Sequence, residues 1–203
     1  MKLSISRLSL AFVLVCFGIA GCAGSSEPIM SLEKFSGQVK IKPKHNGTLS
    51  PAVADQKLFD NGEVLSEDES TAVLRLLKDE TRIELSENTH FTIKNFSQKE
   101  LSQLSGVAVY QVSPQNTELK IQTPHGIATV LGTIFRLDIN ATCTVLIVEE
   151  GRVGFVDKKH SVVVSAGNRY ISELDNSPQA VDPDLLNKLF SDETRTKSYF
   201  NLR

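Results

Sequence analysis

Between about Phe35 and Ser172, apolar and polar residues alternate in short segments with a period of two residues. Such alternation is typical of β-strands that face a core on one side and solvent on the other. The segments are rich in β-branched and aromatic residues, and Asn, Asp, Gly and Pro mark the turns between them. The strand segments are VKIKP, TAVLRLL, TRIEL, HFTIKNF, VAVYQV, ELKIQ, ATVLGTIFRLDI, TVLIVEE, RVGFV and SVVVSAG. With no helical period between them, they predict an all-β domain.

A glycine recurs at the start of three strand segments, in SGQV (36–39), SGVA (105–108) and EGRV (150–153). The intervals between the three are unequal, which argues against a strict repeat of the solenoid kind. The recurrence still predicts short strands stacked over one shared core, in a solenoid-like or a sandwich-like arrangement. We therefore expect a compact multi-strand domain over residues 35–175.

The segments on either side of this domain differ from it in composition. Residues 22–34 begin with small and polar residues and include a proline, so we expect a flexible tether. Near the C-terminus, Asp182 and Pro183 suit the N-cap and the first position of a helix. The apolar residues that follow fall on one helical face, which predicts a short docked helix from about Pro183 to Asp192. Residues 176–203 are assigned to this helix and a tail.

The first 22 residues have the pattern of a bacterial lipoprotein signal. Lys2 and Arg7 form a basic start, and Leu8 to Ala20 is an apolar run too short to span a bilayer. The run leads into IAGC (19–22), which resembles a lipobox. The resemblance implies that residues 1–21 are a cleaved signal peptide and that Cys22 receives a diacylglyceryl group and acyl chains such as palmitate. The alternatives are an ordinary secretory signal with a chance cysteine, or an uncleaved anchor.

The residue after the lipobox cysteine bears on the destination. In bacterial lipoproteins, signals for retention in the inner membrane often place Asp at this position, whereas this chain has Ala23. The resemblance therefore favours lipid anchoring in the outer membrane over the inner membrane. The cell envelope is the expected location in either case, and the lipid is the expected contact with the membrane.

Charge and cysteine content narrow the function classes. The chain has 22 Lys and Arg against 24 Asp and Glu, and loss of the signal would leave 20 against 24 with no basic stripe. This composition argues against a nucleic-acid partner. Cys143 would be the remaining thiol once the signal is removed and Cys22 is acylated, so no internal disulfide is expected. We expect Cys143 to be a small buried residue.

Several glycines lie close together among the later strands, which raises the alternative of a phosphate-binding loop. Such a loop needs a helix directly after its glycines. Gly132 is followed by TIFRLDI, which is an alternating strand, so we expect no bound nucleotide or other cofactor. We assign Gly62, Gly126, Gly132 and Gly151 to turns or points of close strand packing, where added side chains would be crowded.

The stretch TPHGIATVLGTIF (123–135) resembles the signature of the FecR protein family, a T-P-x-G turn followed by a small-residue strand and G-T-x-F. VEEGRV (148–153) and VSAGN (164–168) resemble the next turn and the closing motif of that family, and LFDNGE (58–63) and AVLRL (72–76) resemble its opening. The resemblance covers roughly residues 35–171 and implies a FecR-type β-domain. KDET (78–81) departs from the family's D-G-S or D-G-T turn, so we expect a longer or different turn there.

Candidate catalytic and metal-binding residues are few. His45, His90, His125 and His160 are isolated from one another and from other ligand types, so we expect no metal site and interpret them as exposed loop residues. His125, between Pro and Gly, is expected to project its ring outward as a partner contact, and Asn61, in a DNG turn, is a second candidate. No catalytic motif of the hydrolase or metalloprotease kind is present.

The family resemblance shapes the functional expectations. FecR proteins relay a signal from an outer-membrane receptor to a cytoplasmic sigma factor, and they combine a cytoplasmic segment, a transmembrane helix and a periplasmic FecR domain. This chain resembles the FecR domain alone, behind a lipoprotein signal, so no direct sigma-factor contact is expected. The first hypothesis is a non-enzymatic, lipid-anchored module that binds an envelope protein or glycan, linked to envelope sensing or signalling. The alternative is a structural envelope lipoprotein, a scaffold or spacer, and a hydrolase is least favoured.

Overall fold

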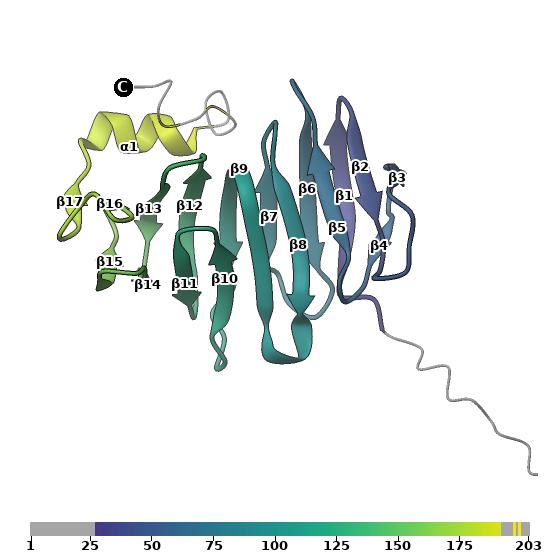
Figure 1. Cartoon of the computed structure of the whole chain (residues 1–203), viewed down its shortest axis with the longest axis horizontal. Helices are drawn as coiled ribbons and strands as arrows, with labels where there is room; N and C mark the ends of the chain where they lie inside the picture. The colour runs from purple at the N-terminus through teal and green to yellow at the C-terminus, as the bar shows by residue number, and fades with distance from the viewer. Residues whose placement is uncertain (1–26, 192–196, 198, 200–203) are drawn as a thin grey trace, which may run out of the picture.

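The computed structural model describes residues 27–191, 197 and 199, and it consists of β-strands with one short α-helix near the C-terminus (Figure 1). The elements are β1 (Met30–Ser36), β2 (Val39–Lys42), β3 (Ser50–Pro51), β4 (Lys57–Leu58), β5 (Glu63–Ser66), β6 (Thr71–Leu76), β7 (Arg82–Leu85), β8 (His90–Asn95), η1 (Phe96–Gln98), β9 (Glu100–Val112), β10 (Leu119–Thr123), β11 (Gly126–Val130), β12 (Thr133–Ile139), β13 (Thr144–Glu150), β14 (Arg152–Val156), β15 (Ser161–Ser165), β16 (Asn168–Ile171), β17 (Gln179–Ala180) and α1 (Pro183–Phe190). The predicted all-β class and the short C-terminal helix are confirmed.

The strands form two sheets that share one strand. Sheet I has the order β4-β1-β6-β7-β9-β12-β13-β16-β17. Sheet II has the order β3-β2-β5-β8-β9-β10-β11-β14-β15. The long strand β9 belongs to sheet II in its first half and to sheet I in its second half. All described pairings are antiparallel except that of β9 with β10.

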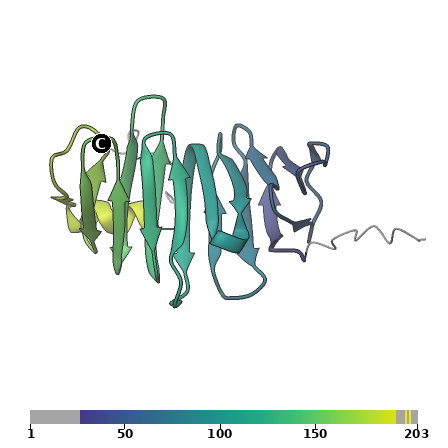
Figure 2. The ribbon, with the colours of Figure 1, turned by 60° about the horizontal axis from the view of Figure 1, so that its bottom comes forward.

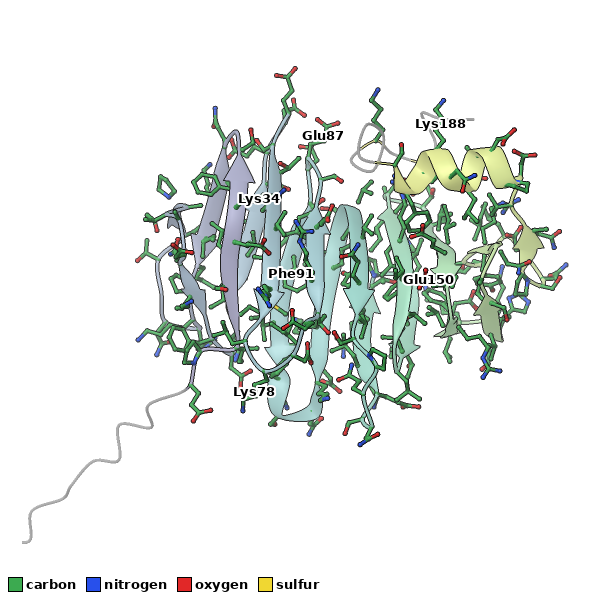
Figure 3. All side chains as sticks on the ribbon, turned by 180° about the vertical axis from the view of Figure 1, so that it is seen from behind. Lys34, Lys78, Glu87, Phe91, Glu150 and Lys188 are labelled. Carbon is green, nitrogen blue, oxygen red and sulfur yellow. The ribbon has the colours of Figure 1, made fainter. Side chains whose placement is uncertain are left out.

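The inner faces of the two sheets pack on each other and form one apolar core. In β12, for example, Phe135, Leu137 and Ile139 face inward and are buried. The rings of Tyr110 and Phe135 stack with their centroids 4.8 Å apart. Figures 2 and 3 show the strands side by side along the long axis. Phe91, labelled in Figure 3, is a fully buried member of this core. The layers are therefore those of a sandwich, although the chain crosses repeatedly between them as in a coil.

The crossings between sheets use left-handed backbone. Ten described residues have positive φ, and eight of them lie in or beside a passage from one sheet to the other. These eight are Gly37, Asp55, Asn61, Glu69, Asn88, Gly106, Gly151 and Gly167. The glycines of the three recurring sequence segments, 37, 106 and 151, are all corners of this kind. The recurrence therefore reports a repeated backbone turn, which glycine adopts without steric cost.

The sheet starts earlier than the sequence analysis predicted. β1 begins at Met30, inside the expected tether, and the side chains of Met30 and Leu32 are fully buried in the core. The segment MSLEKFS lacks β-branched residues, so strand propensity gave no signal there. A register shift between Leu32 and Lys34 further breaks the strict alternation. The expected border at residue 35 is thus corrected to about residue 30.

Helix α1 covers one part of the outer face of sheet I, beside β13 and β16. The Asp182 side chain accepts hydrogen bonds from the backbone N–H groups of Asp184 and Leu185, as predicted for an N-cap. The helix ends at Phe190, two residues before the predicted end. Its buried residues pack with the outward side chains of β9, β13 and β16, and Lys188 lies on the far side of the helix (Figure 3). The cluster contains Val109, Cys143, Val145, Ile147, Ile171, Val181, Leu189, Phe190 and Tyr199.

Two charged residues of β12 are buried beneath this C-terminal segment. Arg136 and Asp138 face outward from sheet I, and their closest charged atoms are 3.6 Å apart. Arg136 donates to the backbone carbonyls of Leu189 and Lys197, and Asp138 accepts from the backbone N–H of Tyr199. Burial lowers the pKa of Arg136 to about 10, although Asp138 opposes this change. The charges therefore bind the C-terminal segment to the sheet instead of facing solvent.

The crowding at Gly132 predicts a stability effect. A Cβ at this position would lie 2.7 Å from Cα of Pro114, a backbone atom that cannot rotate away. We expect Gly132→Ala to cost about 1–3 kcal/mol and to lower the melting temperature by several degrees. Gly154→Ala is the control, because a Cβ there would meet nothing closer than 3.8 Å. Thermal unfolding monitored by circular dichroism checks the pair, and equal melting temperatures would contradict the crowding argument.

Candidate interaction surface

The His125 side chain does not project outward as expected. Its Nδ1 lies 3.0 Å from the hydroxyl of Thr144, on the neighbouring sheet, and the residue is half-buried. The backbone N–H of His125 donates to the Thr123 hydroxyl, which itself lies 3.1 Å from that of Thr144. The T-P-x-G turn therefore folds the imidazole back against β13. His125 as a partner contact stays a prediction.

Asn61 and the turn glycines have structural surroundings that explain their residue types. Asn61 is exposed at the corner between β4 and β5, with a φ of 60°. A Cβ at Gly62 would lie 2.8 Å from the carbonyl oxygens of Phe59 and Pro43, and one at Gly126 would lie 2.7 Å from the Phe155 ring. Gly126, Gly132 and Gly151 thus lie at close packing points, with no helix after Gly132. Partner contact by Asn61 stays a prediction.

The other histidines and the thiol are spread over the molecule. His45 is exposed in a loop, whereas His90 lies in β8 and is half-buried, so the expectation of exposed loop residues is wrong for His90. His160 is also half-buried. Cys143 is buried and free, as expected. Within the described part of the chain, no three His, Cys, Asp or Glu residues gather in a way that could hold a metal ion.

An apolar patch lies on the outer face of sheet II, which has no helix over it in the described structure (Figure 1). The patch consists of Ile127 (42% exposed), Leu131 (49%), Val156 (50%) and Val163 (62%). Cross-strand register places Ile127 opposite Val156, and Gly154 opposite Val163. The missing side chain of Gly154 leaves a groove of about 600 Å³ between β11, β14 and β15. Exposed apolar side chains gathered around such a groove are a common feature of binding surfaces.

Sequence reasoning missed this patch, although a signal was present. A strand with one solvated face alternates apolar and polar residues, but β15 has three valines in succession. Val162 and Val164 are on the inner side, which leaves Val163 on the outer face. An apolar residue at an outward position of a sheet edge is therefore the feature that would have identified the patch.

The patch ends at an open sheet edge. Three of the four edge strands, β3, β4 and β17, are only two residues long. β3 contains a proline, β4 contains a lysine, and both residues of β17 are exposed. The fourth, β15, has five uncharged residues and pairs on one side only, with β14, among the described residues. Proteins usually shorten, charge or cover such edges. An edge without these protections can accept another strand.

The comparisons with known proteins agree with the fold. Residues 63–154, from β5 into β14, match the family model described as FecR protein. This segment is a FecR domain. Two solved structures of a proposed anti-sigma factor from Parabacteroides distasonis ATCC 8503, at 1.65 Å and 2.50 Å resolution, also resemble the chain. In both comparisons the TM-score is 0.53, the identity is 16%, and 63% of this chain and 62% of the other are covered.

At this identity, the likeness to the two solved structures shows a shared fold alone. The chain spans about 62% of the length of these solved proteins. The search of curated proteins found no match. Among residues 27–191, 197 and 199, no helix has the length and apolar character needed to cross a membrane. The lipobox and Cys22 lie outside the described residues, so lipid attachment stays a prediction.

A buried carboxylate fixes the hairpin of β14 and β15, which begins inside the FecR match and continues beyond it. The Asp157 side chain is fully buried and accepts a hydrogen bond of 2.7 Å from the Tyr170 hydroxyl. It also accepts from the backbone N–H groups of Lys159, His160 and Glu173. Burial raises the pKa of Asp157, but these hydrogen bonds outweigh it and bring the pKa down to about 2. The hairpin is therefore held at its tip, independently of the outer face of the sheet.

The lowered pKa of Asp157 predicts an acid-dependent loss of stability. An unfolded Asp has a pKa of about 4, so the ionised side chain stabilises the fold by about 2 kcal/mol above that pH. This contribution is lost as the pH falls from about 4 to the folded value of about 2. Asp157→Asn should lower stability at neutral pH and flatten its dependence on pH in that window. Urea unfolding at several pH values measures both effects.

The control for the loss of one negative charge is Glu118→Gln, at an exposed position on the groove rim. That variant should keep the wild-type slope between pH 4 and 2. If Asp157→Asn also keeps the wild-type slope, the hydrogen bonds at the hairpin tip do not hold the carboxylate as described.

Proposed function

We propose that this chain is a lipid-anchored binding module of the bacterial cell envelope, in which the FecR domain recognises another envelope protein without catalysis. The observation that carries the proposal is the groove on the outer face of sheet II, between β11, β14 and β15, with exposed aliphatic side chains along its border. The anchor rests on the resemblance of residues 19–22 to a lipobox. The FecR match supports a link to envelope sensing or signalling.

The chemistry of the groove favours a protein partner over a glycan. Three of its lining residues, Leu131, Val156 and Val163, are exposed aliphatic side chains, and glycines line part of it. Covering exposed aliphatic side chains removes apolar area from water, which contributes about 25 cal/mol of binding free energy per Å². Glycan sites instead depend on hydrogen bonds with hydroxyl groups, and the polar side chains of this groove, Glu118, Thr129, Arg152 and Ser161, share its lining with this aliphatic border.

Signal relay by direct contact with a sigma factor is not part of this proposal. A lipoprotein signal would place the FecR domain on the far side of the inner membrane from the cytoplasm. The solved structures of similar fold come from a proposed anti-sigma factor, but at 16% identity they support the fold alone. The proposed contribution of this chain to signalling is therefore an interaction inside the envelope.

The proposed anchor can be tested at Cys22. We expect Cys22→Ser to prevent acylation and to leave a precursor that keeps its signal peptide. Metabolic labelling with palmitate and gel mobility check the two effects, and fractionation of wild-type cells checks the favoured outer-membrane location. Cys143→Ser is the matched control, because that thiol is buried in the domain and should not affect labelling. Normal processing and labelling of Cys22→Ser would contradict the lipoprotein assignment.

The proposed binding surface can be tested by crosslinking in living cells. A photoreactive amino acid at Leu131, on the groove rim, should form an adduct with an envelope protein. The same probe at Val53 is the control, because Val53 is 65% exposed in the loop between β3 and β4, far from the groove (Figure 1). Adding Val156→Asp should reduce the Leu131 adduct about tenfold or more, since a carboxylate is costly to bury in an apolar contact.

Three results would contradict the protein-binding proposal. They are no adduct at Leu131, an equal adduct at Val53, or an adduct that Val156→Asp leaves unchanged. An adduct that disappears after digestion of peptidoglycan would favour the scaffold alternative. An adduct with twice the mass of the chain would indicate a second copy as the partner.

A further inference from the structure

We propose that β15 pairs with β15 of a second copy of this chain, antiparallel and centred on Val163, so that sheet II continues across two molecules. This proposal goes beyond the binding of an envelope protein, because the partner is the chain itself. It rests on the open backbone edge, on the symmetry of the strand's sequence and on the absence of charge. Each of these is an observation on the described residues.

The hydrogen-bond register shows which backbone groups of β15 are open. The backbone N–H of Asp157 donates a hydrogen bond to the His160 carbonyl, and the backbone N–H of Ala166 donates one to the Gly151 carbonyl. The residue pairs at both ends of the β14–β15 ladder are therefore hydrogen-bonded pairs. In an antiparallel ladder, bonded and non-bonded pairs alternate. Residues 162 and 164 therefore bond to β14, while the N–H and C=O groups of Ser161, Val163 and Ser165 point away from it.

These outward groups are nearly all unpaired among the described residues. The exception is the Ser165 carbonyl, which accepts a hydrogen bond of 3.2 Å from the Asn168 side chain. A carbonyl oxygen has two lone pairs, so it can accept from a second strand as well. In a pairing centred on Val163, the two Val163 residues would exchange backbone hydrogen bonds with each other. On either side, Ser161 of one copy would exchange backbone hydrogen bonds with Ser165 of the other. The outward groups of both strands would then be satisfied.

The sequence of β15 suits pairing with itself. Ser161-Val162-Val163-Val164-Ser165 is the same in both directions, so a two-fold axis at Val163 places serine opposite serine and valine opposite valine. No charged residue lies within the strand, so no like charges meet at the axis. Lys159 lies just before the strand and would face Gly167 of the second copy, so this lysine would not meet a like charge either.

The outer face gains from the same arrangement. Val163 is the most exposed of the four patch residues, at 62%. In a continuous antiparallel sheet, two directly opposite side chains lie on the same face about 5.5 Å apart at their Cα atoms. The two Val163 side chains would then cover each other, and the apolar patches of both copies would join. The most exposed apolar side chain of the edge strand is thus buried by the same pairing that gives its open backbone groups hydrogen-bond partners.

The experiment is analytical ultracentrifugation of the full-length chain in density-matched detergent, over a wide concentration range. Wild type should form a dimer. Val163→Lys and Val163→Glu should each raise the dissociation constant about tenfold or more, because like charges would meet at the axis. An equimolar mixture of the two variants should recover a dimer, because opposite charges then meet. Val53→Lys is the control for adding a charge at an equally exposed valine, and it should remain dimeric.

Several outcomes would overturn this proposal. Wild type that stays monomeric at every concentration excludes self-pairing, and so does a dimer that persists unchanged in Val163→Lys. Failure of the mixture to recover the dimer would exclude contact between the two Val163 positions. None of these outcomes bears on the Leu131 adduct with an envelope protein, so failure of this proposal is distinguishable from failure of the proposed function.

Discussion

The architecture depends on the ability of the chain to turn sharply between two stacked sheets. Each crossing has to redirect the backbone within a few residues, and L-residues rarely adopt the left-handed conformation that most of these corners need. Gly106 is the clearest case, because β9 runs without a break from sheet II into sheet I at this residue. Its φ is +81°, and a Cβ there would lie 2.5 Å from Cα of Thr89 and 2.6 Å from the carbonyl oxygen of Asn88. A side chain at this corner would force it away from the adjacent corner between β7 and β8.

The same constraint explains which parts of the fold could be predicted. Strands and their turns are encoded locally, by alternation and by Gly and Asn at the corners, so their existence and the short helix could be predicted from the sequence. The arrangement of nine strands in each layer depends on pairings between distant segments, as when β9 contacts β7, β8, β10 and β12. Composition carries no record of such pairings. The choice between a solenoid and a sandwich therefore had to wait for the structure.

The candidate surface was harder to predict than the fold, for a related reason. Alternation shows that a side chain lies on one face or the other, but not what covers the outer face. Arg136 and Asp138 lie at outward positions that normally meet solvent, and the C-terminal segment buries them. Val163 lies at an outward position on sheet II and is left exposed. His125 also follows its tertiary neighbours, since the hydroxyl that holds its ring comes from Thr144, nineteen positions away.

The asymmetry between the two outer faces gives the molecule a direction. Sheet I is covered by α1 near β13 and β16, whereas sheet II is uncovered beside β15 at the same end (Figure 1). The first described residues enter at β1, at the opposite end (Figure 1). Eight strand spacings separate the two ends of sheet II, which amounts to about 38 Å. If Cys22 carries the lipid, the domain is joined to its anchor from the end of the sheets opposite the groove. The attachment then leaves the open edge of β15 clear, so that a strand from another molecule can reach it.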